Sequence, residues 1–174
     1  MEGFNLLVST SRGNEASASK EITGLLNKAG DPEATAEKIH IIGLVTAKTA
    51  LDPFEAIRRI RLLLDERPEL FRYTLKVVPL ESVILTKTDE IRLACEKIAQ
   101  KIDENETFRI TVNKRHSDLS TNEIINSIAS LFDRKVSLKN PDKIVLIEIL
   151  GNLSGVAVIR PTDIFSVVKE RFKR

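Results

Sequence analysis

The sequence predicts a mixed α/β (α+β) fold, because segments with strand periodicity alternate with segments of helical periodicity. Residues 107–113 alternate apolar and polar side chains, which is typical of a strand with one buried face. Residues 53–67 and 88–102 instead repeat apolar side chains every three or four positions, as amphipathic helices do. With 174 residues, of which 42% are hydrophobic, the chain can form one large domain or two small ones.

The amino-terminal half is predicted to run strand, helix, strand, helix, strand. An apolar run at residues 4–8 leads through a polar turn into a helix that ends at Gly30-Asp31-Pro32. We expect a second strand at residues 39–45, with Gly43 at a bulge. Asp52-Pro53 then provides an N-cap and a first-turn proline for the next helix, and residues 72–77 alternate as a third strand.

The carboxy-terminal half is predicted to begin with the helix at residues 88–102. The strand at 107–113 then leads into a basic turn, and the spacing of Ser120 and Glu123 is that of a capping box at a helix start. Residues 144–150 and 153–159 read as two strands, and a last helix is expected from Pro161. Because no flexible Gly/Ser-rich linker separates the halves, we expect domains 1–83 and 84–174 to pack together.

The segment from residue 107 to 159 resembles the THUMP domain, a small RNA-binding module of tRNA-modifying proteins. Its matching residues agree in type, spacing and element order: Phe108-Arg109-Ile110, Lys114-Arg115, Ser120 with Glu123, Leu138-Lys139-Asn140-Pro141-Asp142 and the strand from Ile144. It departs from the THUMP pattern where Phe132-Asp133-Arg134-Lys135 stands in place of a glycine after the helix. The order of elements in residues 1–83 resembles a ferredoxin-like domain, a common amino-terminal companion of THUMP.

The whole chain resembles stand-alone THUMP adaptors of archaeal type that serve tRNA cytidine acetylation. This wider resemblance includes three amino-terminal segments: Phe4 to Thr10 with Arg12-Gly13, Gly43-Leu44-Val45 and Asp52 to Ile57. It implies that the chain binds tRNA and presents it to a separate acetyltransferase that forms N4-acetylcytidine, with no cofactor in this chain. Two alternatives stay open: an RNA-binding module for a methyltransferase or thiouridine synthase, and a regulatory domain that binds a small ligand or a protein.

Basic side chains in both halves are candidates for RNA contacts, because arginine and lysine neutralise phosphate. The THUMP-like half contributes residues on or near its first strand: Arg109, Lys114, Arg115, His116, Lys139 and Arg160. The other half contributes one helix face with Arg58, Arg59 and Arg61. Each could instead be an ordinary solvated residue. Since the chain has seven Phe, one Tyr and no Trp, phosphate and shape contacts are favoured over rows of stacked bases.

Residues suited to catalysis or metal binding are scarce. Cys95 is the only cysteine, which excludes an internal disulfide and a multi-thiolate zinc site, and its place on an apolar helix stripe predicts a buried thiol. No HExxH, GxSxG or GxxxxGK[ST] motif occurs. We therefore expect a protein that is not an enzyme. Without a signal-like amino terminus or a long apolar run, a cytoplasmic location without a membrane span is expected.

Overall fold

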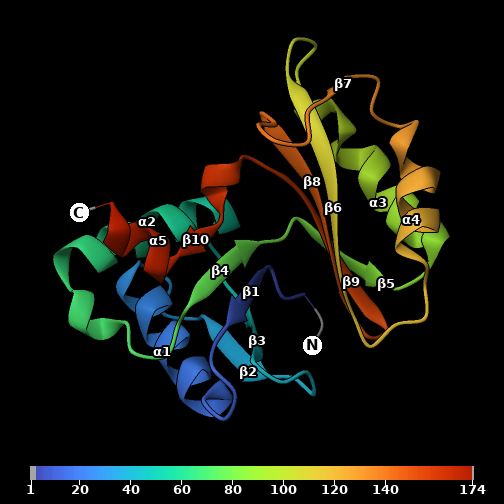
Figure 1. Ribbon diagram of the computed structural model, residues 1–174. Coiled ribbons are helices and arrows are strands. Elements are labelled where there is room, and N and C mark those ends of the chain that lie inside the picture. The colour runs from blue at the N-terminus through green and yellow to red at the C-terminus, as the bar shows by residue number, and fades with distance from the viewer. Residues whose placement is uncertain (1–2, 174) are drawn as a thin grey trace. The chain divides into compact units, whose positions relative to one another are not determined.

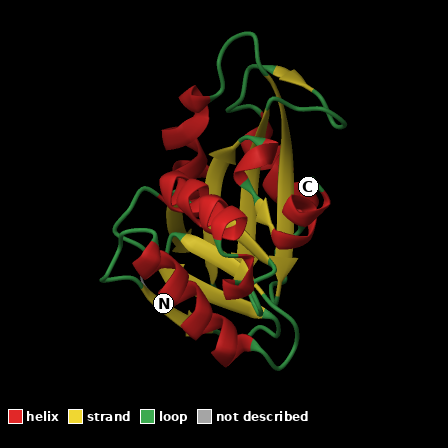
Figure 2. Ribbon diagram, turned by 90° about the vertical axis from the view of Figure 1, so that its left-hand side faces the viewer, coloured by secondary structure: helices red, strands yellow, loops and turns green. Residues whose placement is uncertain are grey.

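The computed structural model describes residues 3–173, which form two compact units (Figure 1). Among the described residues, unit 1 contains 3–80 together with 163–173, and unit 2 is Glu81–Thr162. Each unit combines one five-stranded sheet with helices. Figure 2 colours the helices red and the strands yellow. The predicted mixed α/β class is confirmed.

Unit 1 has the βαββαβ order of a ferredoxin-like domain. Its elements are β1 (Leu6–Ser9), α1 (Glu15–Lys28), β2 (Thr35–Lys38), β3 (Leu44–Lys48), α2 (Pro53–Glu66), a 3-10 turn (Pro68–Leu70) and β4 (Lys76–Pro79), followed much later by β10 (Phe165–Ser166) and α5 (Val167–Phe172). The sheet order is β10-β4-β1-β3-β2, and every neighbouring pair is antiparallel. The buried faces of α1 and α2 share one core with β1, β3 and β4.

The strand predicted at residues 39–45 is wrong over residues 39–43, which form the connection between two strands, and only Leu44 and Val45 lie in a strand. β2 ends at Lys38, and Gly43 adopts φ 80° in the connection just before β3. Strand β2 lies at the sheet edge and is mostly exposed, so it lacks the apolar alternation that would have identified it. The apolar residues nearby belong instead to the connection, where Ile41 is buried.

The carboxy-terminal segment also differs from the prediction. A continuous helix was expected from Pro161, but a 3-10 turn (Pro161–Asp163) and strand β10 precede α5. Phe165 is fully buried in the unit 1 core, with its ring centroid 5.8 Å from that of Phe71, and it pairs with Val77 on β4. The segment from Asp163 is therefore part of unit 1, whereas the sequence had placed it in the domain 84–174.

Unit 2 contains β5 (Ser82–Leu85), α3 (Thr88–Ile98), a 3-10 turn (Ala99–Lys101), β6 (Thr107–Arg115), α4 (Thr121–Ala129), β7 (Lys135–Val136), β8 (Lys143–Leu150) and β9 (Leu153–Ile159). The sheet order is β5-β9-β8-β6-β7, with β6 parallel to β7 and β8. Helices α3 and α4 lie on one side of this sheet (Figure 1) and share a core with its strands.

Several local predictions for unit 2 are confirmed. The strands at 107–113, 144–150 and 153–159 are present, although β6 continues through Arg115 and β5 was not expected. The Ser120 side chain accepts a hydrogen bond from the backbone N–H of Glu123 at 3.3 Å, which is the predicted helix cap. Cys95 is fully buried, and burial raises the pKa of its thiol to about 12.

Candidate nucleic-acid interface

The strand register places the basic candidates of unit 2 in two groups. Strands β6 and β8 run parallel, and their pairing extends from Phe108–Lys143 to Arg115–Leu150. Their carboxyl ends therefore lie at the same end of the sheet. The carboxyl-end group contains Lys114, Arg115 and His116. The amino-end group contains Arg109, Lys139 and Arg160. At about 3.3 Å per residue, Arg109 and Arg115 are about 20 Å apart along the strand, so one small ligand would not contact both groups.

At the carboxyl end of β6, the adjacent residues Lys114 and Arg115 point to opposite faces of the sheet. Lys114 is exposed, and its Nζ donates to the carbonyl of Leu119 at 2.8 Å, which stabilises the turn into α4. His116 is also exposed and has φ 56°, a left-handed conformation that histidine adopts more readily than most residues. The positive end of the α4 macrodipole adds to the favourable potential for an anion here.

Arg115 forms a buried ion pair across the strands. Its Nη1 donates to Oε2 of Glu148 on β8, while the Nδ2 of Asn113 donates to Oε1 at 2.9 Å. The Glu148 side chain is 2% exposed and the Arg115 side chain 30% exposed. Both carboxylate oxygens are therefore occupied by side chains from the neighbouring strand, and the guanidinium still reaches the surface.

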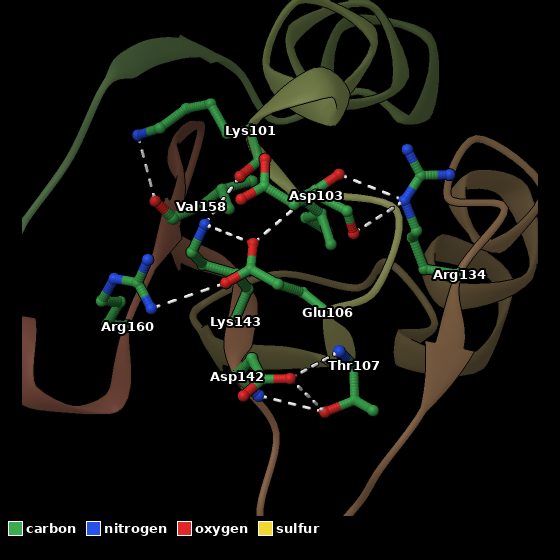
Figure 3. Close-up of polar contacts among 10 residues, drawn as sticks. Lys101, Asp103, Glu106, Thr107, Arg134, Asp142, Lys143, Val158 and Arg160 are labelled. Carbon is green, nitrogen blue, oxygen red and sulfur yellow. Dashed lines mark hydrogen bonds and ion pairs between the residues drawn. The ribbon is translucent and has the colours of Figure 1, made fainter.

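At the opposite end of the sheet, Glu106 is the centre of a polar network (Figure 3). Its Oε1 accepts from the backbone N–H of Asp103 and from Lys143 Nζ, each at 2.9 Å, and its Oε2 lies 3.5 Å from Arg160 Nη1. The hydrogen bond from the Asp103 backbone N–H is the main reason that the pKa of Glu106 lies below its usual 4.5, and the hydrogen bond from Lys143 is the second. The Arg160 side chain remains 57% exposed and could contact a ligand at this edge.

The other cations in this network hold the backbone in place (Figure 3). Lys143 Nζ also donates to the carbonyl of Lys101 at 2.7 Å, and Lys101 Nζ donates to the carbonyl of Val158 at 3.2 Å. Arg134 Nε donates to the carbonyl of Asp103 at 3.0 Å. These contacts tie the connection before β6 to β8 and β9, so we attribute a mainly structural role to these cations.

Arg109 and Lys139 lie on neighbouring segments at this end. Arg109 Nη1 donates to the carbonyl of Leu138 at 3.0 Å and so fixes the loop that carries Lys139. Lys139 is exposed, as are the apolar neighbours Val136 and Leu138. The structure thus presents Lys139 on a supported loop, with Arg109 as part of the support.

The three arginines predicted on α2 of unit 1 do not form one cluster. Arg58 lies 2.7 Å from Glu55 and is 59% exposed. Arg59 pairs with the same carboxylate at 3.1 Å and donates to the carbonyl of Ala29 at the end of α1. The hydrogen bond from Arg58 is the main reason that the pKa of Glu55 lies below its usual 4.5, and the hydrogen bond from Arg59 is the second. Arg58 is the most accessible cation of this group.

Arg61 lies on a different side of α2. Its Nε is 3.0 Å from Oε1 of Glu170 on α5, and its guanidinium carbon lies 5.9 Å from the centroid of the Phe165 ring. This geometry is that of a cation–π contact beside an ion pair. Arg61 therefore helps to attach the carboxy-terminal segment within unit 1.

Two acidic residues important in this geometry, Glu106 and Glu148, were missed by the sequence analysis. A signal existed for Glu148, because it is the one charged residue inside the apolar run from Ile144 to Leu150. No comparable signal existed for Glu106, which lies in a polar connection. Its role depends on Lys143 and Arg160, which only the strand pairing brings beside it.

Other kinds of site have little support in residues 3–173. A cavity of about 200 Å³ in unit 1, lined by residues that include Glu37, Thr46 and Lys48, is smaller than the roughly 300–1,000 Å³ usual for ligand pockets. Within the same residues, no group of three His, Cys, Asp or Glu side chains could hold a metal ion. No helix in this part of the chain is long and apolar enough to cross a membrane.

Residues 86–158 match the family model of the THUMP domain. Unit 2 therefore contains a THUMP domain, as the sequence resemblance predicted. No functionally curated protein gives a significant match to the chain.

Solved structures share the fold of both units. A protein from Pyrococcus horikoshii Ot3, PH1313, aligns over 94% of this chain with 17% identity and a TM-score of 0.63. TrmN from Thermus thermophilus aligns over 90% with 19% identity and a TM-score of 0.57. A 4-thiouridine synthetase, in a complex with RNA and bound ATP, aligns over 90% with 12% identity and a TM-score of 0.54. The chain spans about half the length of these proteins, 55%, 46% and 41% respectively.

Proposed function

We propose that this chain binds tRNA and presents it to a separate enzyme that modifies the tRNA. The observation that carries this proposal is the THUMP domain at residues 86–158, with exposed cations at both ends of its strand β6. The similar fold of a 4-thiouridine synthetase that is described in complex with RNA supports it. Phosphate neutralisation by lysine and arginine would supply most of the affinity.

The proposed contacts differ in what the structure leaves available to RNA. Lys114, His116, Lys139, Arg160 and Arg58 are exposed and are the first candidates. The remaining four are only partly exposed and would contribute through the donors that their intramolecular contacts leave available: Arg109, Arg115, Arg59 and Arg61. Arginine can do this because its guanidinium carries five N–H donors.

The enzyme that we propose as partner is the acetyltransferase that forms N4-acetylcytidine. The support is the resemblance to acetylation adaptors, which extends beyond the THUMP half to three segments of unit 1: Phe4 to Thr10, Gly43 to Val45, and Asp52 to Ile57. On this proposal the chain performs no chemistry, and the acetyl-coenzyme A site belongs to the partner. Binding and positioning alone are sufficient to accelerate a reaction between bound partners.

A second candidate is the same tRNA-binding role for a different modification enzyme, such as a thiouridine synthase or a methyltransferase. The specific observation that favours it is the fold shared with the 4-thiouridine synthetase over 90% of this chain. Co-purification from native cells distinguishes the two candidates by the enzyme that is recovered.

The direct test combines the purified chain, tRNA, acetyl-coenzyme A and the cognate acetyltransferase, with acetylcytidine measured by mass spectrometry. We expect no product from the chain alone and substantially more product when both proteins are present than with the acetyltransferase alone. Product from the chain alone would make it an enzyme. Equal yields from the acetyltransferase with and without the chain would exclude an adaptor role.

A further inference from the structure

We propose that Glu148 is a positioning residue, which fixes the guanidinium of Arg115 for contact with a phosphate of bound tRNA. This inference rests on the proposed function and adds a residue to its binding surface that does not itself touch RNA. It follows from the burial of Glu148, from the way its two oxygens are used and from the partial exposure of Arg115.

The carboxylate of Glu148 lies in an environment that otherwise excludes charge. Strand β8 is buried along its whole length, and Glu148 is the one charged residue in its run from Ile144 to Leu150. Its direct partner on β9 is Gly155, and its direct partner on β6 is Asn113. The only cation paired with this carboxylate within residues 3–173 is Arg115.

The hydrogen bonds give Arg115 a defined orientation. One oxygen of Glu148 accepts from Asn113 at 2.9 Å and the other from Nη1 of Arg115. A carboxylate held from both sides cannot rotate freely, and the planar guanidinium that it binds is restricted with it. The N–H groups of Arg115 not used by Glu148 are therefore restricted in direction before any ligand arrives.

Stability alone is a poor explanation for this pair. Apolar residues in place of a buried ion pair are often neutral or stabilising, because removing two charges from water is costly. The surface pair Arg58–Glu55 differs, since its side chains are 59% and 37% exposed. In the pair Arg115–Glu148, the Glu148 side chain is 2% exposed and the Arg115 side chain is 30% exposed. Glu148 is therefore inaccessible to a ligand, whereas the guanidinium of Arg115 that it holds reaches the surface.

Restricting Arg115 in advance would strengthen phosphate binding, because less side-chain freedom is lost when the complex forms. Lys114, the next residue, has a flexible side chain and a single ammonium, so it suits general charge neutralisation. The pair Glu148–Arg115 would instead fix the direction from which a phosphate approaches this end of β6.

The test measures tRNA affinity against salt concentration for the full chain and for Glu148→Gln, Arg115→Ala and the double variant. The glutamine has nearly the same shape but offers one acceptor oxygen where the carboxylate offered two. We expect Glu148→Gln to weaken binding about tenfold, as for one charge-assisted hydrogen bond. The slope of log affinity against log salt should fall by about 0.7–0.9, as for one phosphate contact.

The double variant provides the decisive comparison. If Glu148 acts through Arg115, adding Glu148→Gln to Arg115→Ala should cause no further loss of affinity. Glu148→Asp keeps the charge and should recover part of the wild-type slope. It also serves as the folding-competent variant if the glutamine variant does not fold.

Glu81→Gln is a matched control in the same unit. Glu81 is a 19% exposed carboxylate that pairs with Lys101 and accepts from the backbone N–H of Val158 at 2.8 Å. Removing the Glu81 charge should lower the denaturation midpoint without changing the slope of log tRNA affinity against log salt.

Four results would overturn the inference. Tighter binding by Glu148→Gln with a steeper salt slope would show that Glu148 merely neutralises Arg115. Additive losses in the double variant would show that the two residues act independently. Binding by Arg115→Ala equal to that of the wild type would exclude the contact while leaving the proposed function intact, whereas absence of tRNA binding by the wild-type chain would remove both.

Discussion

Glu106 and Lys143 form an ion pair of 2.9 Å that joins the connection before β6 to the first residue of β8. Both side chains are largely buried, 15% and 10% exposed, and Lys143 also donates to the carbonyl of Lys101. The same carboxylate faces Arg160 at 3.5 Å. Glu106 thus holds together the amino-terminal ends of β6 and β8 in unit 2. It also restrains Arg160, a cation that we propose for RNA binding.

The first prediction concerns the acid sensitivity of unit 2. Because the pKa of Glu106 is lower in the folded state than its usual 4.5, the folded state favours the ionised carboxylate. Its contribution to stability is therefore complete above about pH 4.5 and is lost as pH falls through the lowered folded value. Glu106→Gln should reduce stability at pH 7 and flatten its decline on acidification.

Urea denaturation at pH 7 and in steps from pH 5 to pH 3 checks this prediction. Glu123→Gln is the control, because Glu123 is exposed on α4 and forms no ion pair within residues 3–173. A decline in stability for Glu106→Gln as steep as that of the wild type would place the acid-sensitive group elsewhere.

The second prediction concerns the two groups of cations along β6. Lys114→Ala and Lys139→Ala remove one exposed ammonium from opposite ends of the sheet, and each should lower the salt slope of tRNA binding by about 0.7–0.9. Because the sites are far apart, the effects should add in the double variant. Lys97→Ala on the α3 surface is the control and should bind like the wild type. A change for only one of the two variants would confine the RNA surface to that end.

Much of this fold could be predicted because its local signals agree with its tertiary structure. Asp52 caps α2 through bonds of 3.0 Å to the N–H groups of Phe54 and Glu55, and Ser120 caps α4. In each case the capping residue precedes a helix with a clear apolar stripe. Signals of this kind act within a few residues, so the sequence displays them directly.

The features that escaped prediction depend on residues that are distant in sequence. Strand β10 is only two residues long and exists because Phe165 and Ser166 pair with Val77 and Lys76 on β4. Likewise, the candidate list recognised Arg115 by its charge but not by its partner, because Glu148 is reached only through the parallel β6–β8 register. The sequence shows that a residue is a cation, but the strand pairing determines which side chains lie close enough to bind it.

The third prediction tests the role of the carboxy-terminal segment in unit 1. Phe165→Ala removes a fully buried ring and should lower stability by about 3–5 kcal/mol, the usual cost of deleting a core phenylalanine. Phe172→Ala is a control with the same chemical change seven residues later, where the side chain is 85% exposed, and should alter stability by less than about 0.5 kcal/mol. Chemical denaturation measures both. Similar stabilities for the two variants would mean that β10 is not part of the unit 1 core.

The last prediction asks whether unit 1 contacts tRNA. Arg58 is the most exposed arginine among the three α2 candidates, so Arg58→Ala in the full chain should weaken tRNA binding and lower its salt slope by about 0.7–0.9. Arg67→Ala is a matched control, since Arg67 is 54% exposed and likewise pairs with a nearby glutamate, Glu69, at 2.7 Å. Removing either pair alone should cost little stability, because exposed ion pairs contribute roughly 0–1 kcal/mol.

The two variants together distinguish a contact from a general effect of charge. A reduced slope for Arg58→Ala with a wild-type slope for Arg67→Ala would place an RNA phosphate beside α2. Equal reductions for both would indicate long-range attraction by net charge, which falls off within about 8 Å at physiological salt and should disappear as salt is raised. Wild-type binding by both variants would remove α2 from the RNA surface and leave unit 1 as a structural support or a docking site for the enzyme.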